Sequence, residues 1–209
     1  VLAPIRERTR LRSFEGAHGI VAPRFNQTGM ETIKMLLERT ERTGELTFKG
    51  KPLTVVGERL KPGDKFPAVT LTAPDWSEVD LGALHGTVRL ISVVPSLDTG
   101  ICDAQTKRFD EEAEAFGDKV KVITVSADLP WAQRRWVSDT EVKHITVLSD
   151  HKAMAFGDAA GTHVKEMRIE QRAIFVVDKD DTVAYVEYVP EIAQHPDYDA
   201  AIEAVKKLI

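Results

Sequence analysis

The sequence predicts an α/β domain with a central mixed β-sheet flanked by helices. From residue 45 onward, short apolar segments typical of strands alternate with segments of helical periodicity. Near the end, residues 173–177 and 182–189 form a strand pair around the polar turn at 178–181. The chain has 209 residues, 43% of them hydrophobic and 29% charged. This length suits one domain of about 150–170 residues plus an appendage.

The chain begins with a segment unlike the rest. Residues 1–29 hold five arginines, two acidic residues and no lysine, and their apolar runs are short. This composition predicts a mostly disordered extension. A targeting segment is the alternative, although Glu7 and Glu15 argue against it.

A short helix is expected over about residues 29–43. Thr28 and Glu31 have the spacing of a capping box, and Gly44 can end the helix. Its apolar stripe consists of Met30, Ile33, Leu36 and Leu37. The predicted organisation is therefore an N-terminal extension, residues 1–44, followed by a domain, residues 45–209.

The domain opens with a β-hairpin. Residues 46–48 and 52–56 are its two strands, and the chain turns at Gly50. The Pro-Gly pair at 62–63 marks a further turn, and residues 68–72 form a short strand.

Strands and helices then alternate. The expected strands are residues 88–94, 120–126, 145–148, 173–177 and 182–189. The expected helices are residues 103–116, 131–139 and 198–208. Their apolar faces consist of Ala104, Phe109, Ala113 and Phe116 in the first helix, and of Ile202, Val205 and Leu208 in the last. Pro130 sets the entry of the middle helix.

The single cysteine, Cys102, lies where a strand turns into a helix. It ends the run Pro-Ser-Leu-Asp-Thr-Gly-Ile-Cys, which follows the apolar strand at 88–94. A helix start offers unpaired N–H groups and a positive dipole end, and both favour thiolate over thiol. A free cysteine is more often a small buried apolar group. The placement of this one nevertheless makes the chain a candidate redox enzyme.

Three neighbours favour a functional thiol at Cys102. Thr99 is placed to cap the helix and to point its hydroxyl at whatever lies near the sulfur. Pro95 stiffens the loop and can shield one side from water, and Gly100 allows close approach of the backbone to a substrate. A cation would complete the site, but spacing does not select one of the arginines.

Composition excludes several other kinds of site. One cysteine cannot form an internal disulfide or a zinc site built on cysteine pairs. The six histidines show no metal-ligand spacing, so neither a metal nor a bound cofactor is expected. A formal charge of −5 argues against nucleic acid as the main partner, and no apolar stretch is long enough to span a membrane. Hydrolase chemistry with a Cys–His pair stays open.

Several separated segments, in the right order, resemble the bacterial thiol peroxidases, a branch of the peroxiredoxins. The run from Pro95 to Cys102 resembles their peroxidatic motif. The other similar segments are residues 48–54, 126–136, 172–178 and 191–201. The resemblance covers about residues 45–209 and leaves residues 1–44 outside.

The resemblance implies a thioredoxin-like fold with an added N-terminal hairpin, and a homodimer; we expect a cytoplasmic protein. It implies that Cys102 is the peroxidatic cysteine and that Pro95, Thr99 and Arg172 complete its pocket. The Cys102 thiolate would attack the O–O bond of hydrogen peroxide or an organic hydroperoxide and become a sulfenic acid. Arg172 would stabilise the thiolate and the leaving oxygen, Thr99 would hold the peroxide, and Pro95 would limit water access.

One position departs from the family pattern. Most thiol peroxidases carry a resolving cysteine just after the aromatic residue that follows their Ser-Ala-Asp-Leu-Pro segment, and here that position is Val137. An external thiol, from thioredoxin, glutaredoxin or a small molecule, would therefore resolve the sulfenic acid. The alternative is a redox-sensing or binding protein that acts through sulfenylated Cys102.

Overall fold

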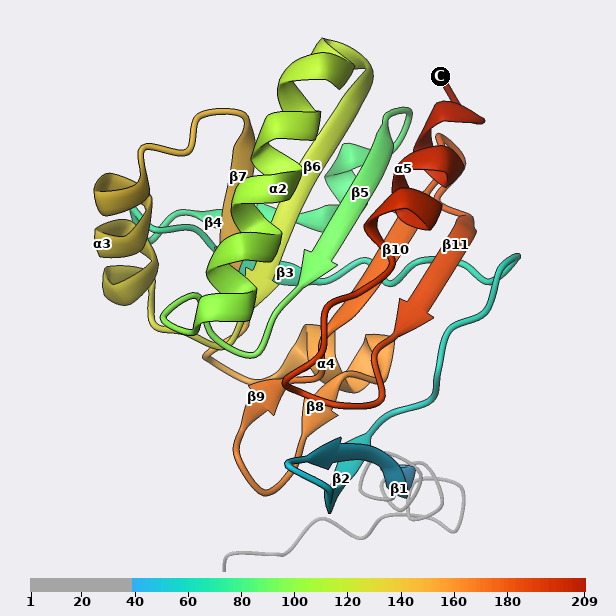
Figure 1. Ribbon diagram of the computed structural model, residues 1–209. Coiled ribbons are helices and arrows are strands. Elements are labelled where there is room, and N and C mark those ends of the chain that lie inside the picture. Colours follow the sequence, from blue (N-terminus) through green and yellow to red (C-terminus); the bar gives the residue numbers. More distant parts are fainter. Residues whose placement is uncertain (1–38) are drawn as a thin grey trace, which may run out of the picture. The chain divides into compact units, whose positions relative to one another are not determined.

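A seven-stranded mixed sheet forms the centre of the fold (Figure 1). The computed structural model describes residues 39–209. The strands follow across the sheet in the order β11 (Val183–Tyr188), β10 (Ala173–Val177), β5 (Val88–Val93), β6 (Val120–Ser126), β7 (Ile145–Ser149), β3 (Thr70–Thr72) and β4 (Glu78–Asp80). Strands β5, β6 and β7 run parallel, whereas β10 and β3 join them antiparallel. The predicted central mixed sheet is confirmed.

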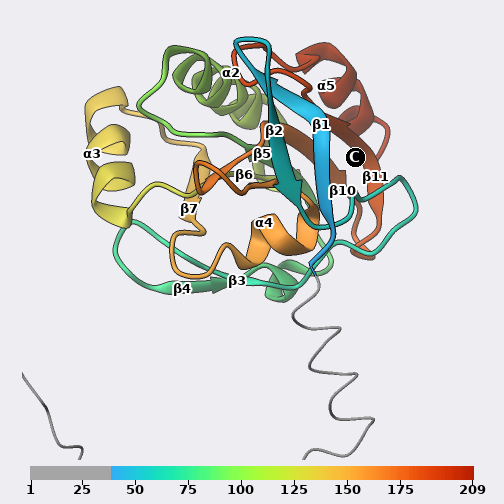
Figure 2. The same cartoon turned by 90° about the horizontal axis from the view of Figure 1, so that it is seen from below.

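Helices cover both faces of this sheet. Seen from below, α2 (Gly100–Phe116) and α5 (Tyr198–Lys206) lie on one side and α4 (Ala155–Ala160) on the other (Figure 2). Helix α3 (Pro130–Thr140) packs against β7. Two short 3₁₀ helices, η1 (Leu81–Leu84) and η2 (Gly117–Lys119), complete the set. Within residues 39–209, no helix combines the length and the apolar character that crossing a bilayer requires.

The two central strands are buried along their whole length. Every residue of β5 and β10 is buried, and side chains alternate between the two faces. Ile91 and Phe175 pack with Phe156 of α4, whereas Leu90 and Ile174 pack on the other face with α2 and α5. Strands buried on both faces are nearly continuous apolar runs, and the sequence analysis identified these two strands from such runs rather than from an alternating pattern.

A second sheet lies near the carboxyl ends of the parallel strands (Figure 1). It consists of β1 (Glu41–Phe48), β2 (Lys51–Val56), β8 (His163–Val164) and β9 (Ile169–Glu170), each antiparallel to its neighbour. Lys49 and Gly50 form the two-residue turn between β1 and β2, and their φ angles are 52° and 76°. Two positive φ angles are typical of a type I′ turn. The predicted hairpin and its turn are confirmed.

The structure corrects two details of the sequence analysis. The expected helix over about 29–43 lies mostly outside the described residues, but residues 41–43 belong to strand β1, because they pair with residues 54–56 of β2. Ala104 is exposed, so it is not part of the buried face of α2. That face instead includes Gln105 and Thr106, which hydrogen bonds satisfy.

The elements that the sequence analysis did not predict are short. Helix α4 has six residues, β4 has three, and β8 and β9 have two each. Segments of this length carry too little periodicity to be recognised, and their pairing partners are distant in sequence.

Two buried carboxyl groups, Glu170 of β9 and Asp150 after β7, lie near α4. Glu170 accepts a hydrogen bond from the Thr162 hydroxyl over 2.5 Å. Asp150 accepts a hydrogen bond from the Gly157 backbone N–H of α4. Burial first, and then the charge of Asp150, raise the pKa of Glu170 well above its usual value. The protonated form of Glu170 is therefore favoured, and the hydrogen bond from Thr162 ties β9 to the segment after α4.

Candidate active site

Cys102 lies in the first turn of α2, after the short loop that follows the carboxyl end of β5. Thr99 is the N-cap residue of the 17-residue helix, so Cys102 is its third residue. The side chain is fully buried in a small apolar cluster with Leu97 and Trp136. The predicted position of the thiol at a strand-to-helix junction is confirmed, and the helix start favours negative charge on the sulfur.

The hydroxyl of Thr99 points at the sulfur rather than capping the helix. Its Oγ1 lies 2.9 Å from Cys102 Sγ and 3.0 Å from the carbonyl oxygen of Ser96. The Thr99 side chain makes no capping hydrogen bond to the helix, so the prediction that it caps α2 is wrong. The reason is geometric, because a hydroxyl directed across the turn at the sulfur is turned away from the helix N–H groups.

Arg172 reaches the sulfur from the other side. It lies between β9 and β10 and is 1% exposed. Its Nη2 is 3.3 Å from Cys102 Sγ and also donates to the carbonyl oxygen of Ile192 over 3.1 Å. Its Nη1 donates to Gln105 Oε1 over 2.7 Å. The guanidinium therefore places a positive charge beside the sulfur and is held there by two oxygen acceptors.

Gln105 supports this arrangement and was not predicted from sequence. It is fully buried one turn after Cys102 on α2, and its Nε2 donates to the Ser92 hydroxyl of β5 over 2.8 Å. This bond orients the amide so that its oxygen faces Arg172. The available signal was a polar residue three positions after Cys102, on the same side of a helix as Phe109.

An acidic residue fastens the loop before Cys102. Asp128, after β6, accepts hydrogen bonds from the Ser96 hydroxyl, the Leu97 backbone N–H and the Ser126 hydroxyl, each over 2.8 Å. The loop that carries Pro95 and Thr99 is thereby tied to the end of the neighbouring parallel strand.

A cavity of about 390 Å³ opens on the groups that contact the sulfur. Pro95, Thr99 and Arg172 contribute to its lining. The remaining wall is mostly apolar and includes Phe48, Ile101, Met167, Ile169 and Ile192. All four residues expected at the site are thus close together: Cys102 with Thr99 and Arg172 in contact, and Pro95 in the same wall. The apolar wall was not predicted, because it comes from four separate segments.

Val137 lies on α3 and is half-buried against the apolar cluster that contains Cys102. The helix that would carry a second thiol in the related proteins therefore packs near the sulfur. Within residues 39–209, no cluster of His, Cys, Asp or Glu side chains is arranged to hold a metal ion.

The sequence and the fold are similar to those of known proteins. The Redoxin family profile matches residues 61–202. A thiol peroxidase of Halalkalibacterium halodurans is 52% identical over 161 residues, which cover 77% of this chain and 96% of that protein. A thiol peroxidase of Bacillus subtilis is 48% identical over 165 residues, covering 79% of this chain and 98% of that protein. A peroxiredoxin-like protein of Aquifex aeolicus superposes with a TM-score of 0.74 at 38% identity, covering 82% of this chain and 99% of that one.

Replacing the cation beside the sulfur should slow the reaction of the thiol with an electrophile. For Arg172→Met we expect alkylation of Cys102 by iodoacetamide at neutral pH to slow about 10-fold or more. The lost hydrogen bond to a charged group corresponds to about 1.5–3 kcal/mol. The rate is measured by intact mass.

Arg135→Met is the matched control, because Arg135 pairs with Asp98 of the same loop and is exposed. Equal slowing in both variants, or none in Arg172→Met, would contradict the role assigned to Arg172.

Proposed function

Since this chain belongs to the Redoxin family and is a thiol-dependent peroxidase, we propose that Cys102 reduces the peroxide with the help of Thr99, Arg172 and Pro95. One observation carries this proposal. A hydroxyl and a buried guanidinium converge on a single sulfur, at 2.9 and 3.3 Å, and both line an adjoining cavity.

In the proposed reaction, the Cys102 thiolate attacks one oxygen of the peroxide. An S–O bond forms and the O–O bond breaks, so the sulfur becomes a sulfenic acid and the second oxygen leaves with the electron pair. That oxygen takes up a proton from water and departs as water or an alcohol. The charge of Arg172 stabilises the leaving oxygen, and Thr99 turns its hydroxyl from the sulfur to the bound peroxide. Pro95 restricts the entry of water.

The sulfenic acid is reduced by an external thiol. The chain has one cysteine, so no second sulfur of its own can react. A thiol attacks the sulfenic sulfur, releases water and forms a mixed disulfide, and a second thiol then restores Cys102. Thioredoxin, glutaredoxin and small thiols are the proposed donors. Because these donors keep thiols reduced in the cytosol, we place the protein in the cytoplasm.

We propose hydrogen peroxide and organic hydroperoxides as the substrates. The apolar wall of the cavity, from Phe48 to Ile192, supports the second class because it offers a surface for an organic group. We propose that residues 45–209 form the peroxidase domain, in which every residue named for chemistry lies, and that residues 41–44 of strand β1 join it because this strand pairs with β2. The residues before β1 are then the extension. The redox-sensor alternative is not favoured, because the relatives are enzymes.

We also propose that the protein forms a homodimer through an exposed aromatic patch. Three of the five large hydrophobic residues exposed in the described chain gather here: Trp76, Leu129 and Trp131. The Trp76 and Trp131 rings are 4.7 Å apart, and Trp131 is 63% exposed. Large aromatic residues that stay in water on a monomer are typical of protein interfaces.

Removing the nucleophile should abolish turnover. For Cys102→Ser we expect peroxide consumption with excess dithiothreitol to fall below about one hundredth of wild type, because a hydroxyl is a far weaker nucleophile at neutral pH. Circular dichroism should show an unchanged fold. Turnover above a few per cent in a folded variant would refute Cys102 as the nucleophile.

Introducing a second thiol should restore an internal disulfide. In wild-type protein, one equivalent of hydrogen peroxide should add 16 mass units, as a sulfenic acid. In Val137→Cys we expect a loss of about two mass units instead, and better turnover with thioredoxin, because α3 packs near the sulfur. A sulfenic adduct alone in the variant would mean that Val137 does not occupy the vacant resolving position.

The homodimer is tested by sedimentation equilibrium. Wild-type protein should have about twice the 23.2 kDa chain mass. Trp131→Glu should be monomeric, since an interface cannot readily bury an unpaired charge. Ile209→Glu, at an exposed residue away from the patch, should stay dimeric. A monomeric wild type, or a dimeric Trp131→Glu, would disprove this interface.

A further inference from the structure

The carboxylate of Glu191 joins two segments that border the active-site cavity. Its Oε2 accepts hydrogen bonds from the Thr47 hydroxyl over 2.7 Å and from the Gly50 backbone N–H over 3.4 Å. Its Oε1 accepts from the backbone N–H groups of Lys49 and Ala193 over 3.1 and 3.2 Å. One side chain therefore receives four donors, three of them from the β1–β2 hairpin.

The carboxylate suits these donors because it stays charged. The hydrogen bond from the Thr47 hydroxyl is the largest cause that lowers the pKa of Glu191 to about 2, and the backbone donors add to it. In a type I′ turn the N–H groups of Lys49 and Gly50 have no partner within the turn that could compete. The backbone N–H groups of the turn therefore bind a charged Glu191 carboxylate at every pH at which the protein works.

Both joined segments supply the apolar wall of the cavity. Phe48 directly precedes the turn, and Ile192 and Ala193 directly follow Glu191. All three residues line the cavity. The wall therefore depends on how the hairpin is held against the segment after β11.

Two kinds of bond hold this junction, and they have different consequences. Backbone bonds from the Thr47 N–H to Pro190 and from the Ile192 N–H to Thr47 fix the carbonyl that supports Arg172. The Glu191 carboxylate fixes the turn beside Phe48. Loss of the carboxylate would therefore loosen the aromatic wall while the backbone bonds keep Arg172 in place.

We propose that Glu191 is a positioning residue that sets the preference for bulky over small hydroperoxides by fastening the β1–β2 turn beside the cavity. The inference rests on the proposed function, because it assumes that peroxides enter this cavity. The organic group of a bulky hydroperoxide needs the wall at Phe48, whereas hydrogen peroxide needs only Thr99, Arg172 and the sulfur.

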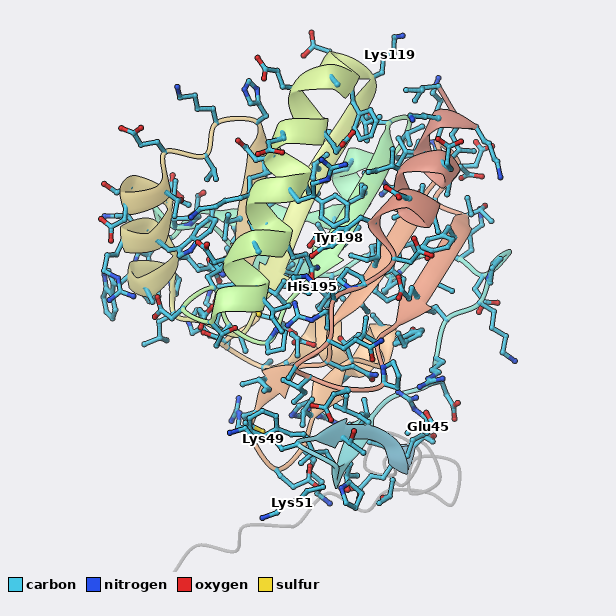
Figure 3. The ribbon with its side chains drawn as sticks, in the orientation of Figure 1. Glu45, Lys49, Lys51, Lys119, His195 and Tyr198 are labelled. Atoms are coloured by element: carbon cyan, nitrogen blue, oxygen red, sulfur yellow. The ribbon has the colours of Figure 1, made fainter. Side chains whose placement is uncertain are left out.

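The test compares two substrates in matched variants. For Glu191→Gln and Glu191→Ala we expect kcat/KM for cumene hydroperoxide to fall about 10-fold, the size expected when one ordered wall side chain becomes mobile. The value for hydrogen peroxide should change less than twofold. The fall in kcat/KM for cumene hydroperoxide should be smaller in Glu191→Gln than in Glu191→Ala, because the glutamine amide keeps one acceptor oxygen. Glu45→Gln is the control, because this exposed carboxylate of β1 pairs with Arg42 and Arg59 and not with the turn; Figure 3 shows Glu45 well apart from Lys49.

A double-mutant cycle connects the effect to the wall. In a Phe48→Ala background, Glu191→Ala should add little further loss with cumene hydroperoxide, because the side chain that it positions is gone. Full additivity of the two losses, an equal loss with both peroxides, or no loss at all would overturn the proposal.

Measurements without turnover separate this proposal from the proposed function. In a Cys102→Ser background, Glu191→Ala should weaken binding of 2-phenyl-2-propanol, the alcohol formed from cumene hydroperoxide, about 10-fold by NMR titration. It should also speed hydrogen exchange at the Lys49 and Gly50 amides. Failure of wild-type protein to consume peroxide would refute the proposed function only, whereas unchanged binding and exchange would refute the role of Glu191.

Discussion

The structure depends on how one buried positive charge is accommodated. The Arg172 guanidinium is almost completely removed from water, and a cation in such a place is stable only where acceptors or a negative charge surround it. Here the partners are Cys102 Sγ, Gln105 Oε1 and the carbonyl oxygen of Ile192, from three separate parts of the chain. In the proposed reaction, the cation held by these contacts also stabilises the negative charge that develops on the leaving oxygen.

The fold supplies these partners through its central strands. Because β5 and β10 are adjacent, the loop after β5 and the start of β10 meet at one end of the sheet. Helix α2 begins there and carries both Cys102 and Gln105, and Ser92 at the end of β5 orients the amide. Asp128, at the end of β6, holds the loop between strand and helix. The parallel strands thus position the sulfur, and the antiparallel one brings the arginine.

The four-stranded sheet contributes to the site in a different way from the central seven-stranded sheet. It contributes no group that contacts the sulfur, but its hairpin and the segment after β11 supply much of the apolar wall. In the proposed function, the chemical step and the recognition of the substrate therefore depend on different elements of one chain. The single cysteine adds a constraint of its own, because a fully buried sulfenic acid must be reached by a thiol from outside. The cavity, open on Thr99 and Arg172, offers one route.

The sequence by itself determined the features that depend on near neighbours. Six of the seven strands of the main sheet, the hairpin turn at Lys49-Gly50 and the helix start at Cys102 all follow from residues a few positions apart. Resemblance to a family, rather than spacing, selected Arg172, which lies 70 residues from Cys102 in the sequence. Only the tertiary structure decided the rest. Gln105, the carbonyl of Ile192 and the carboxylate of Glu191 act through contacts between distant segments, and such contacts leave no periodic signal. The direction of the Thr99 hydroxyl was also decided by the structure, because its spacing in the sequence allowed both the helix cap and the contact with Cys102 Sγ that the structure shows.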